Sequence, residues 1–243
     1  SSLLILTLAS GITFLTGLSI AGISSNTPVK GGGAYYLISR VLGPGFGTAI
    51  GLALYIAQAL SVPFYILGFV EALVDTFPFL QAYFLPVCLG VLGVLFVLVW
   101  LGAGWVIKLQ YGILTVLFCS IGAFLLGAWL KFDPEVFRAN LGSDYAAGQN
   151  LWRMFALYFP AVTGIMAGVN MSGDLKTPGR SIAIGTLSAV LTGYAVYALQ
   201  IVLCGGMAPR VELVAQPYLV LVENAVWGLG WLGTAGGFLA TLS

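Results

Sequence analysis

A proline and two glycines lie in the middle of one long apolar segment, where they could turn the main chain into a binding site. Pro160 removes one main-chain hydrogen-bond donor and clashes with the carbonyl four residues earlier, and Gly164 and Gly168 lower the cost of leaving helical geometry. In apolar surroundings, exposed main-chain groups persist only where protein or a water-filled cavity satisfies them. The pattern therefore predicts a helix that is broken near residues 160–166 and lines a binding cavity.

The two ends of such a break have opposite chemistry, because carbonyl oxygens point out of the preceding half-helix and N–H groups out of the following one. The carbonyls near Pro160 and the hydroxyl of Thr163 offer hard oxygen ligands for a cation. The N–H groups of Gly164, Ile165 and Met166 offer a nest for an anion. The alternative is a simple proline kink in which the Thr163 hydroxyl bonds back to its own helix.

A second polar feature lies in the apolar segment 45–75. Gln58, Ser61 and Tyr65 share one helix face because they are spaced i, i+3 and i+7. A phenol oxygen in mid-membrane can coordinate a cation. Alternatively, Tyr65 hydrogen-bonds a neighbouring helix or belongs to an interfacial aromatic belt, and the residues alone leave both interpretations open.

Catalytic side chains are scarce. The chain has no histidine, which removes the usual general base and the commonest transition-metal ligand. Its three cysteines form no Cys-x-x-Cys pair and are predicted to be small buried hydrophobic residues, and no two carboxylates pair within an apolar segment. We therefore expect no enzyme, no cofactor and no metal beyond alkali cations. The net charge of +1 predicts no nucleic-acid partner.

The composition indicates a membrane protein, since 60% of the 243 residues are hydrophobic and only 7% are charged, against about a quarter in soluble domains. Apolar runs such as Leu3-Leu4-Ile5-Leu6 do not alternate as barrel strands do. An all-α, polytopic membrane helix bundle is predicted, and it forms a single transmembrane domain over 1–243 that is truncated at both ends. Spans of ~20 residues are expected near 2–25, 45–75, 82–102, 106–131, 150–174, 181–206 and 219–243.

The distribution of basic residues predicts the orientation of these spans. The connections 26–44, 103–105 and 175–180 fall on one side, which carries Lys30, Arg40, Lys108, Lys176 and Arg180. The opposite side carries Lys131, Arg138, Arg153 and Arg210. Because cytoplasmic loops are enriched in Lys and Arg, we expect the first side to be cytoplasmic in an integral protein of the plasma (inner) membrane.

Glycines at four-residue spacing predict close contact between helices. Gly43, Gly47 and Gly51 have the small-xxx-small spacing that lets membrane helices approach each other. We interpret these three residues as a helix-packing face.

Two runs of the sequence carry a family resemblance. The first is Lys30 to Arg40, KGGGAYYLISR, and the second is Phe159 to Leu175, FPAVTGIMAGVNMSGDL. They resemble the loop after the second membrane helix, and the broken sixth helix with its exit, of the cation-chloride cotransporters. That family is a branch of the amino acid-polyamine-organocation transporters. The resemblance implies a LeuT-like inverted-repeat fold, of which this chain covers helices two to eight, in a prokaryotic or minimal relative.

The resemblance also implies roles for individual residues. The potassium contacts that it implies are Tyr65, Pro160 and Thr163. The chloride contacts are the N–H groups of Gly164, Ile165 and Met166. The start of a sodium motif is implied at Ala240 and Ser243. Pro63, two residues before the tyrosine, departs from the small apolar residue expected there.

These observations predict an ion-coupled secondary active transporter that moves potassium and chloride, with sodium as a candidate third ion, by alternating access. The expected partners are those ions and membrane lipid, and a homodimer is left open. An amino acid or amine permease of the same superfamily is the main alternative, with a substrate carboxylate at the N–H groups around Gly164. An intramembrane enzyme and a scaffold subunit without transport activity are the alternatives from other classes.

Overall fold

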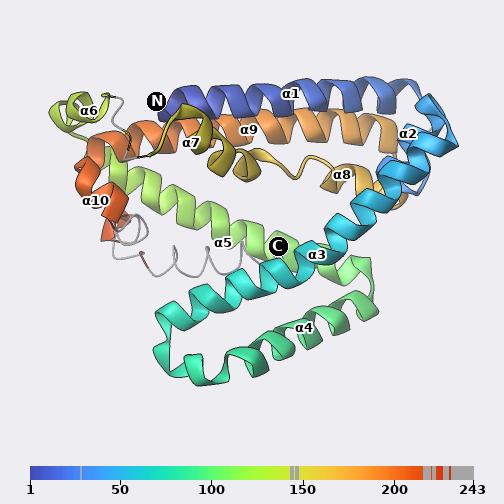
Figure 1. The fold of residues 1–243 in the computed structure, drawn as a ribbon, viewed down its shortest axis with the longest axis horizontal. Helices are drawn as coiled ribbons and strands as arrows, with labels where there is room; N and C mark the ends of the chain where they lie inside the picture. The colour runs from blue at the N-terminus through green and yellow to red at the C-terminus, as the bar shows by residue number, and fades with distance from the viewer. Residues whose placement is uncertain are drawn as a thin grey trace. The chain divides into compact units, whose positions relative to one another are not determined.

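The computed structural model describes residues 1–27, 29–142, 145, 148–215, 220, 223–226 and 230, without the side chains of residues 75, 76, 103 and 106. The described chain is helical and contains no strand (Figure 1), which confirms the all-α prediction. The α-helices are α1 (Ser2–Asn26), α2 (Gly33–Leu42), α3 (Pro44–Thr76), α4 (Phe84–Leu101), α5 (Ala103–Leu130), α6 (Pro134–Asn140), α7 (Leu151–Tyr158), α8 (Ala167–Asn170), α9 (Pro178–Met207) and α10 (Arg210–Ala215). The 3₁₀ segments are η1 (Pro78–Tyr83), η2 (Phe159–Val162) and η3 (Ser172–Asp174).

Six helical stretches of the described residues are long and apolar enough to cross a membrane. They are Ser2–Asn26, Pro44–Val74, Pro78–Leu101, Ile107–Leu130, Leu151–Asn170 and Pro178–Met207. These stretches confirm the polytopic membrane helix bundle, and they fall on the first six segments expected from the sequence. The seventh expected span, 219–243, lies almost entirely outside the described residues.

The chain divides into two compact units. The first consists of Ser1–Tyr55 with Phe137–Gly205, and the second consists of Ile56–Val136 with the described part of Gly206–Ser243. Helix α3 begins in the first unit and ends in the second. The single transmembrane domain expected over 1–243 stays a prediction.

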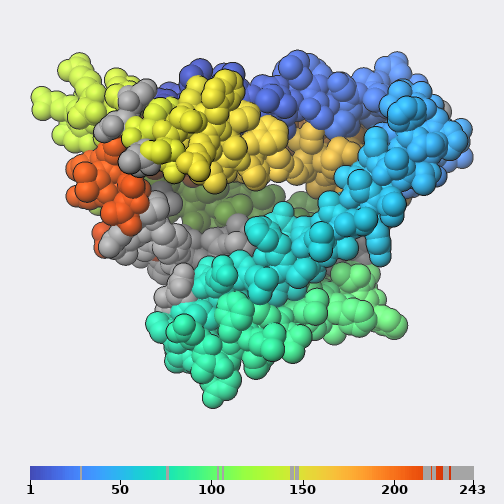
Figure 2. Space-filling model, viewed as in Figure 1, coloured from blue at the N-terminus to red at the C-terminus, as the bar shows by residue number. Residues whose placement is uncertain are grey.

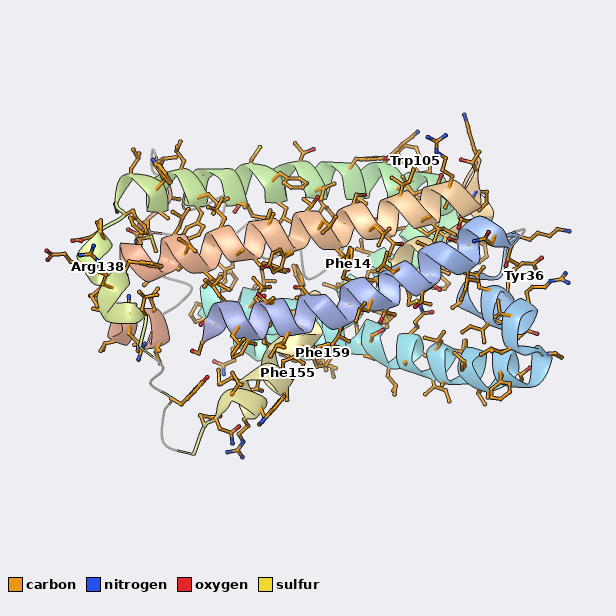
Figure 3. All side chains as sticks on the ribbon, turned by 90° about the horizontal axis from the view of Figure 1, so that it is seen from above. Phe14, Tyr36, Trp105, Arg138, Phe155 and Phe159 are labelled. Carbon is orange, nitrogen blue, oxygen red and sulfur yellow. The ribbon has the colours of Figure 1, made fainter. Side chains whose placement is uncertain are left out.

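In the first unit, α1 and α9 run antiparallel, side by side (Figures 1 and 3). Two glycines make the close approach of these helices feasible. A Cβ atom at Gly17 would lie 3.5 Å from Thr186 Cγ2, and one at Gly179 would lie only 2.6 Å from the carbonyl oxygen of Ser24. The Ser24 hydroxyl also donates to the Gly179 carbonyl at 3.4 Å.

Helix α1 buries a stripe of small and polar side chains. Ser10, Thr13 and Ser24 are all buried, while Leu15 on another face is 65% exposed. The hydroxyls of Thr13 and Ser24 donate to the carbonyls of Ala9 and Ala21 in their own helix. The same buried stripe includes Leu6 and Ile20, whereas Thr16 and Ser19 are exposed, so polarity alone does not mark the side of α1 that packs against protein.

Helix α2 lies in the segment 26–44, which the sequence predicted to be a connecting loop, and that prediction was wrong for residues 33–42. Ala34 and Leu37 are buried and join a core cluster with Ile20, Val169 and Ile182. A ten-residue helix is too short to give a membrane-length apolar signal, and the basic residues Lys30 and Arg40 made the segment resemble a loop. The true connections are short and contain glycines with positive φ, 123° at Gly32 and 94° at Gly43.

The predicted glycine face is confirmed at two of its three positions. A Cβ atom at Gly47 would overlap the Ser39 side chain, and one at Gly51 would lie 3.0 Å from the Tyr35 ring. These glycines therefore let α2 pack closely against the start of α3. The prediction was wrong for Gly43, which has no atom within 4 Å of its Cβ position and instead forms the turn between the two helices.

In the second unit, the later part of α3 packs against α4 through Ile66, Val70 and Cys88. Cys88 is buried as predicted, but Cys119 is exposed on α5, where the apolar lipid makes burial in protein unnecessary. Helix α5 begins at Ala103, so the expected connection 103–105 shrinks to Gly102, whose φ is 99°. Helix α9 likewise begins at Pro178, inside the expected connection 175–180.

Candidate functional site

The helix predicted to be broken near residues 160–166 is broken. Helix α7 ends at Tyr158 and continues as one 3₁₀ turn, η2, after which Thr163 is extended (φ −89°, ψ −173°) and Gly164 has a φ of 98°. Helical geometry resumes only at Ala167. Figure 2 shows this yellow segment on the surface turned toward the viewer, in front of α1 and α9.

Local sequence explains where the helix stops. The ring centroids of Phe155 and Phe159 lie 5.5 Å apart across the junction of α7 and η2 (Figure 3). The aromatic face of α7 therefore continues through the first turn of η2. Pro160 then cannot donate a helical hydrogen bond. The positive φ of Gly164 is a conformation that glycine adopts without strain, and it turns the chain away from the helix axis.

Two oxygens come together on the cation side of the break. The Thr163 hydroxyl donates to the Pro160 carbonyl at 2.7 Å, and the Thr163 N–H donates to the same carbonyl at 3.3 Å. The hydroxyl bond is the one that the proline-kink alternative predicted. That alternative is nevertheless wrong as a whole, because residues 163–166 leave helical geometry.

The N–H groups on the other side of the break point to no acceptor. In the part of the chain that the structure describes, no hydrogen bond is donated by the N–H of Gly164, Ile165 or Met166. The side chains of Ile165 and Met166 pack against the core cluster around Val169 and Ile182, which anchors this stretch of main chain. Helix α8 has only four residues, so these N–H groups, rather than a long helix dipole, supply the positive potential.

Two side chains that sequence reasoning missed hold the remaining carbonyls of the break. Thr13 on α1 lies 3.2 Å from the carbonyl oxygen of Val162, and Tyr197 on α9 lies 3.4 Å from that of Ala161. The sequence carried only a weak signal, since each is one of several hydroxyl residues in its span. Such residues usually face protein or a cavity.

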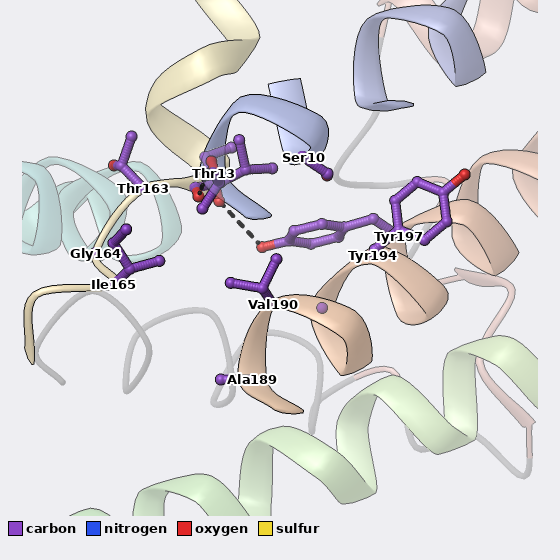
Figure 4. Close-up of a pocket in the computed structure, with 12 residues that line it drawn as sticks. Ser10, Thr13, Thr163, Gly164, Ile165, Ala189, Val190, Tyr194 and Tyr197 are labelled. Atoms are coloured by element: carbon purple, nitrogen blue, oxygen red, sulfur yellow. Dashed lines mark hydrogen bonds between the residues drawn. The ribbon is translucent and has the colours of Figure 1, made fainter. Parts of the chain in front are cut away.

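A cavity of about 220 Å³ lies between α1, the break and α9 (Figure 4). Its lining residues are Ser10, Thr13, Ala161, Val162, Thr163, Gly164, Ile165, Ala189, Val190, Gly193, Tyr194 and Tyr197. The hydroxyl of Tyr197 faces the break, whereas that of Tyr194 lies 3.2 Å from the Thr7 hydroxyl. The predicted cavity beside the broken helix is therefore present in the first unit.

The remaining predicted site residues lie elsewhere. Tyr65 is in the second unit, on α3, with its side chain 57% exposed and its ring 5.9 Å from that of Phe64. Its part in a site with Pro160 and Thr163 stays a prediction. Ala240 and Ser243 lie outside the described residues.

The two runs that carried the resemblance touch each other. Ser172 is buried, accepts a hydrogen bond from the Gly33 N–H at 3.3 Å, and donates to the Lys30 carbonyl at 3.1 Å. A Cβ atom at Gly31 would lie 3.7 Å from the Cα of Gly173. The glycine-rich run before α2 therefore packs against the exit of the broken helix.

A polytopic helical bundle with one span unwound around a proline and a glycine is the architecture of a secondary transporter. Residues 1–223 match the family described as amino acid permease. The chain is 38% identical over 214 residues to solute carrier family 12 member 2 of Homo sapiens and 36% identical over 222 residues to member 1 of the same species. It is 35% identical over 243 residues to member 2 of Danio rerio.

These alignments cover 81%, 84% and 92% of the chain, respectively. The chain belongs to the amino acid permease family, in the solute carrier family 12 branch of cation-chloride cotransporters that its two runs resemble. It is an integral membrane protein. It spans about a fifth of the length of these curated relatives, between 18% and 21%.

Proposed function

We propose that this chain is the ion-binding part of a secondary active transporter that moves potassium and chloride together by alternating access. The observation that carries the proposal is the break in the fifth candidate span, which offers oxygens at one end and unbonded N–H groups at the other. A site with both polarities suits the simultaneous binding of a cation and an anion. The protein catalyses no chemical reaction in this proposal.

Potassium binds at the Pro160 carbonyl and the Thr163 hydroxyl. These two oxygens lie 2.7 Å apart, and oxygen dipoles of this kind replace the hydration shell of a potassium ion in protein sites. Two ligands are too few for an alkali cation, and we propose that the phenol oxygen of Tyr65, the third potassium contact that the family resemblance implies, completes part of the shell. Sodium, the candidate third ion, binds at Ala240 and Ser243.

Chloride binds at the N–H groups of Gly164, Ile165 and Met166. Successive N–H groups that converge outside a helix form a concave anion site, and these three have no acceptor among the described residues. A cation and an anion a few residues apart stabilise each other strongly where water is scarce. That mutual stabilisation explains why the two ions are transported together.

The same proposal places the chain in the plasma (inner) membrane, with the segments 26–44 (which includes α2), 103–105 (the start of α5) and 175–180 on the cytoplasmic side. The Ser172 hydroxyl donates to the Lys30 carbonyl at 3.1 Å, which supports the assignment of the first and third segments to one side. Lipid surrounds the spans, and assembly into a homodimer is left to experiment.

Uptake of rubidium, a potassium substitute, by the full-length protein in proteoliposomes tests the function. We expect uptake that requires chloride, and a rise of about ten-fold or more in the KM for rubidium in Thr163→Ala, since a ligand bond to an ion contributes about 1.5–3 kcal/mol. Thr163→Ser keeps the hydroxyl and serves as the matched control. Unchanged rubidium uptake in both Thr163→Ala and Tyr65→Phe contradicts the potassium assignment.

One alternative stays open, an amino acid or amine permease, the activity after which the matching family is described. In that case the N–H groups around Gly164 bind a substrate carboxylate, because the same donors suit either anion. Proteoliposomes loaded identically and offered radiolabelled chloride or a mixture of labelled amino acids distinguish the two functions. Amino acid uptake without chloride dependence replaces the cotransporter proposal with this alternative.

A further inference from the structure

Two neighbouring carbonyls in the break are held by hydroxyls from two different helices. Thr13 Oγ1 on α1 lies 3.2 Å from the Val162 oxygen, and the Tyr197 hydroxyl on α9 lies 3.4 Å from the Ala161 oxygen (Figure 4). We propose that Thr13 and Tyr197 are positioning residues, which fix the unwound main chain in the geometry that binds ions. This inference rests on the proposed function and adds to it residues that touch no transported ion.

The surroundings of the two hydroxyls suit this role. Thr13 is only 5% exposed, and its hydroxyl lies 3.2 Å from its own helix carbonyl at Ala9 as well as from Val162. Tyr197 is half-buried along the cavity. Without these two hydroxyls, each carbonyl would lack the hydrogen-bond donor that an unbroken helix supplies, which costs several kcal/mol in apolar surroundings. Both hydroxyls therefore satisfy groups that exist only because the helix is broken.

Because the peptide bond is planar, fixing a carbonyl oxygen of the break also orients the N–H group of the next residue at the ion site. The carbonyl of Val162 and the N–H of Thr163 belong to one rigid plane. Holding the Val162 oxygen on α1 therefore orients the Thr163 N–H, which donates to the Pro160 carbonyl at 3.3 Å. Holding the Ala161 oxygen on α9 orients the preceding plane in the same way.

The two bonds also decide which carbonyls remain for a cation. The Ala161 and Val162 oxygens point to different helices and already accept hydrogen bonds. Among the described residues, the Pro160 oxygen accepts only from Thr163, within the break. Thr13 and Tyr197 thus restrict the cation to the Pro160 side of the turn.

The chain offers matched controls on the same helices. Ser188 on α9 is exposed, lies outside the cavity lining, and donates to the carbonyl of Gly185 in its own helix at 3.1 Å. Thr16, three residues after Thr13 on α1, is also exposed and donates to the carbonyl of Ile12 at 2.9 Å. Ser188→Ala and Thr16→Val therefore each remove a helix hydroxyl without touching the proposed restraint.

Rubidium and chloride uptake by the full-length protein is the first test. Both bonds are longer than the ~2.8 Å typical of hydroxyl donors, so we expect a rise of about two- to five-fold in the KM for each ion in Tyr197→Phe and Thr13→Val. The maximal rate should stay nearly constant, and Thr13→Ser should restore the KM. Equal KM changes in the Ser188→Ala and Thr16→Val controls overturn the inference.

Hydrogen exchange provides a readout that does not depend on transport. In the full-length protein, we expect faster amide exchange in peptides covering residues 163–167 in Tyr197→Phe and Thr13→Val, and wild-type exchange in the two controls. Unchanged exchange in all variants overturns the positioning role. If the wild-type protein takes up neither ion but the exchange differs as expected, the proposed function fails and the positioning role of the two hydroxyls stands.

Discussion

The hydroxyl of Ser172 lies 3.3 Å from the main-chain nitrogen of Gly33 and accepts its hydrogen bond, although 139 residues separate them in sequence. The same hydroxyl donates to the carbonyl of Lys30 at 3.1 Å. The buried Ser172 side chain, in the segment that follows the broken helix, thus satisfies one donor and one acceptor of the glycine-rich run. The exit of the candidate site and the start of α2 are therefore joined through main-chain groups.

Removing this hydroxyl should destabilise the protein. Ser172→Ala leaves the Gly33 N–H and the Lys30 carbonyl without their bond, and an unsatisfied buried polar group costs about 1–3 kcal/mol. Thermal unfolding of the purified protein in detergent should therefore begin at a lower temperature. Ser188→Ala is the control, because that exposed hydroxyl bonds only the carbonyl of Gly185 in its own helix. Equal melting temperatures for the two variants contradict this prediction.

The glycine run should tolerate alanine at its first position but not at its third. Gly33 has a φ of 58°, and a Cβ atom there would lie 3.1 Å from the side-chain oxygen and 3.2 Å from the Cα of Asn170. A left-handed conformation alone costs a non-glycine residue about 1–2 kcal/mol. At Gly31 the nearest atom would be 3.7 Å away. The yield of folded protein after mild heating should fall for Gly33→Ala and stay near wild type for Gly31→Ala, and the reverse order refutes the packing argument.

Membrane-length apolar runs and helix-breaking residues predicted much of this structure. Each of the six spans that the structure describes contains enough consecutive apolar residues to be recognised from the length of the apolar run. The break was predictable because Pro160 lacks a main-chain donor and Gly164 adopts a positive φ without strain, although Pro63 lies inside the continuous helix α3.

Features that depend on a partner far along the chain were not predictable in this way. Thr13 and Tyr197 meet the break only because α1 and α9 both pack against it. Helix α2 is short, and its burial against Val169 and Ile182 is a property of the packed unit. Local patterns predict elements, whereas such contacts need the arrangement of the elements.

Packing between α2 and α3 should depend on one glycine and not on its neighbour. Gly47→Ala introduces a methyl group where the Ser39 side chain lies, whereas Gly45 has no atom within 4 Å of its Cβ position. Overpacking of this kind costs about 1–3 kcal/mol. We expect a lower midpoint of denaturation in Gly47→Ala and no loss in Gly45→Ala. A second change, Ser39→Ala in the Gly47→Ala background, should recover part of the stability, and its failure to do so argues against this contact.

Alanine substitutions at Gly164 and Gly168 distinguish main-chain strain from steric crowding at the candidate anion site. Neither Gly164 nor Gly168 has an atom within 4 Å of its Cβ position, but only Gly164 has a positive φ, 98°. Alanine at 164 therefore adds about 1–3 kcal/mol of main-chain strain, which the break can relieve by moving its N–H groups. Alanine at 168, inside α8, should be neutral or stabilise by about 0.5 kcal/mol.

Chloride-dependent rubidium uptake should therefore fall in Gly164→Ala, with a higher KM for chloride, and stay at the wild-type level in Gly168→Ala. Surface expression measured in parallel distinguishes a transport defect from a folding defect. The two substitutions add the same methyl group four residues apart, so a shared effect would point to added volume. Equal chloride KM values in both variants would show that the positive φ of Gly164 is not needed to present the N–H groups.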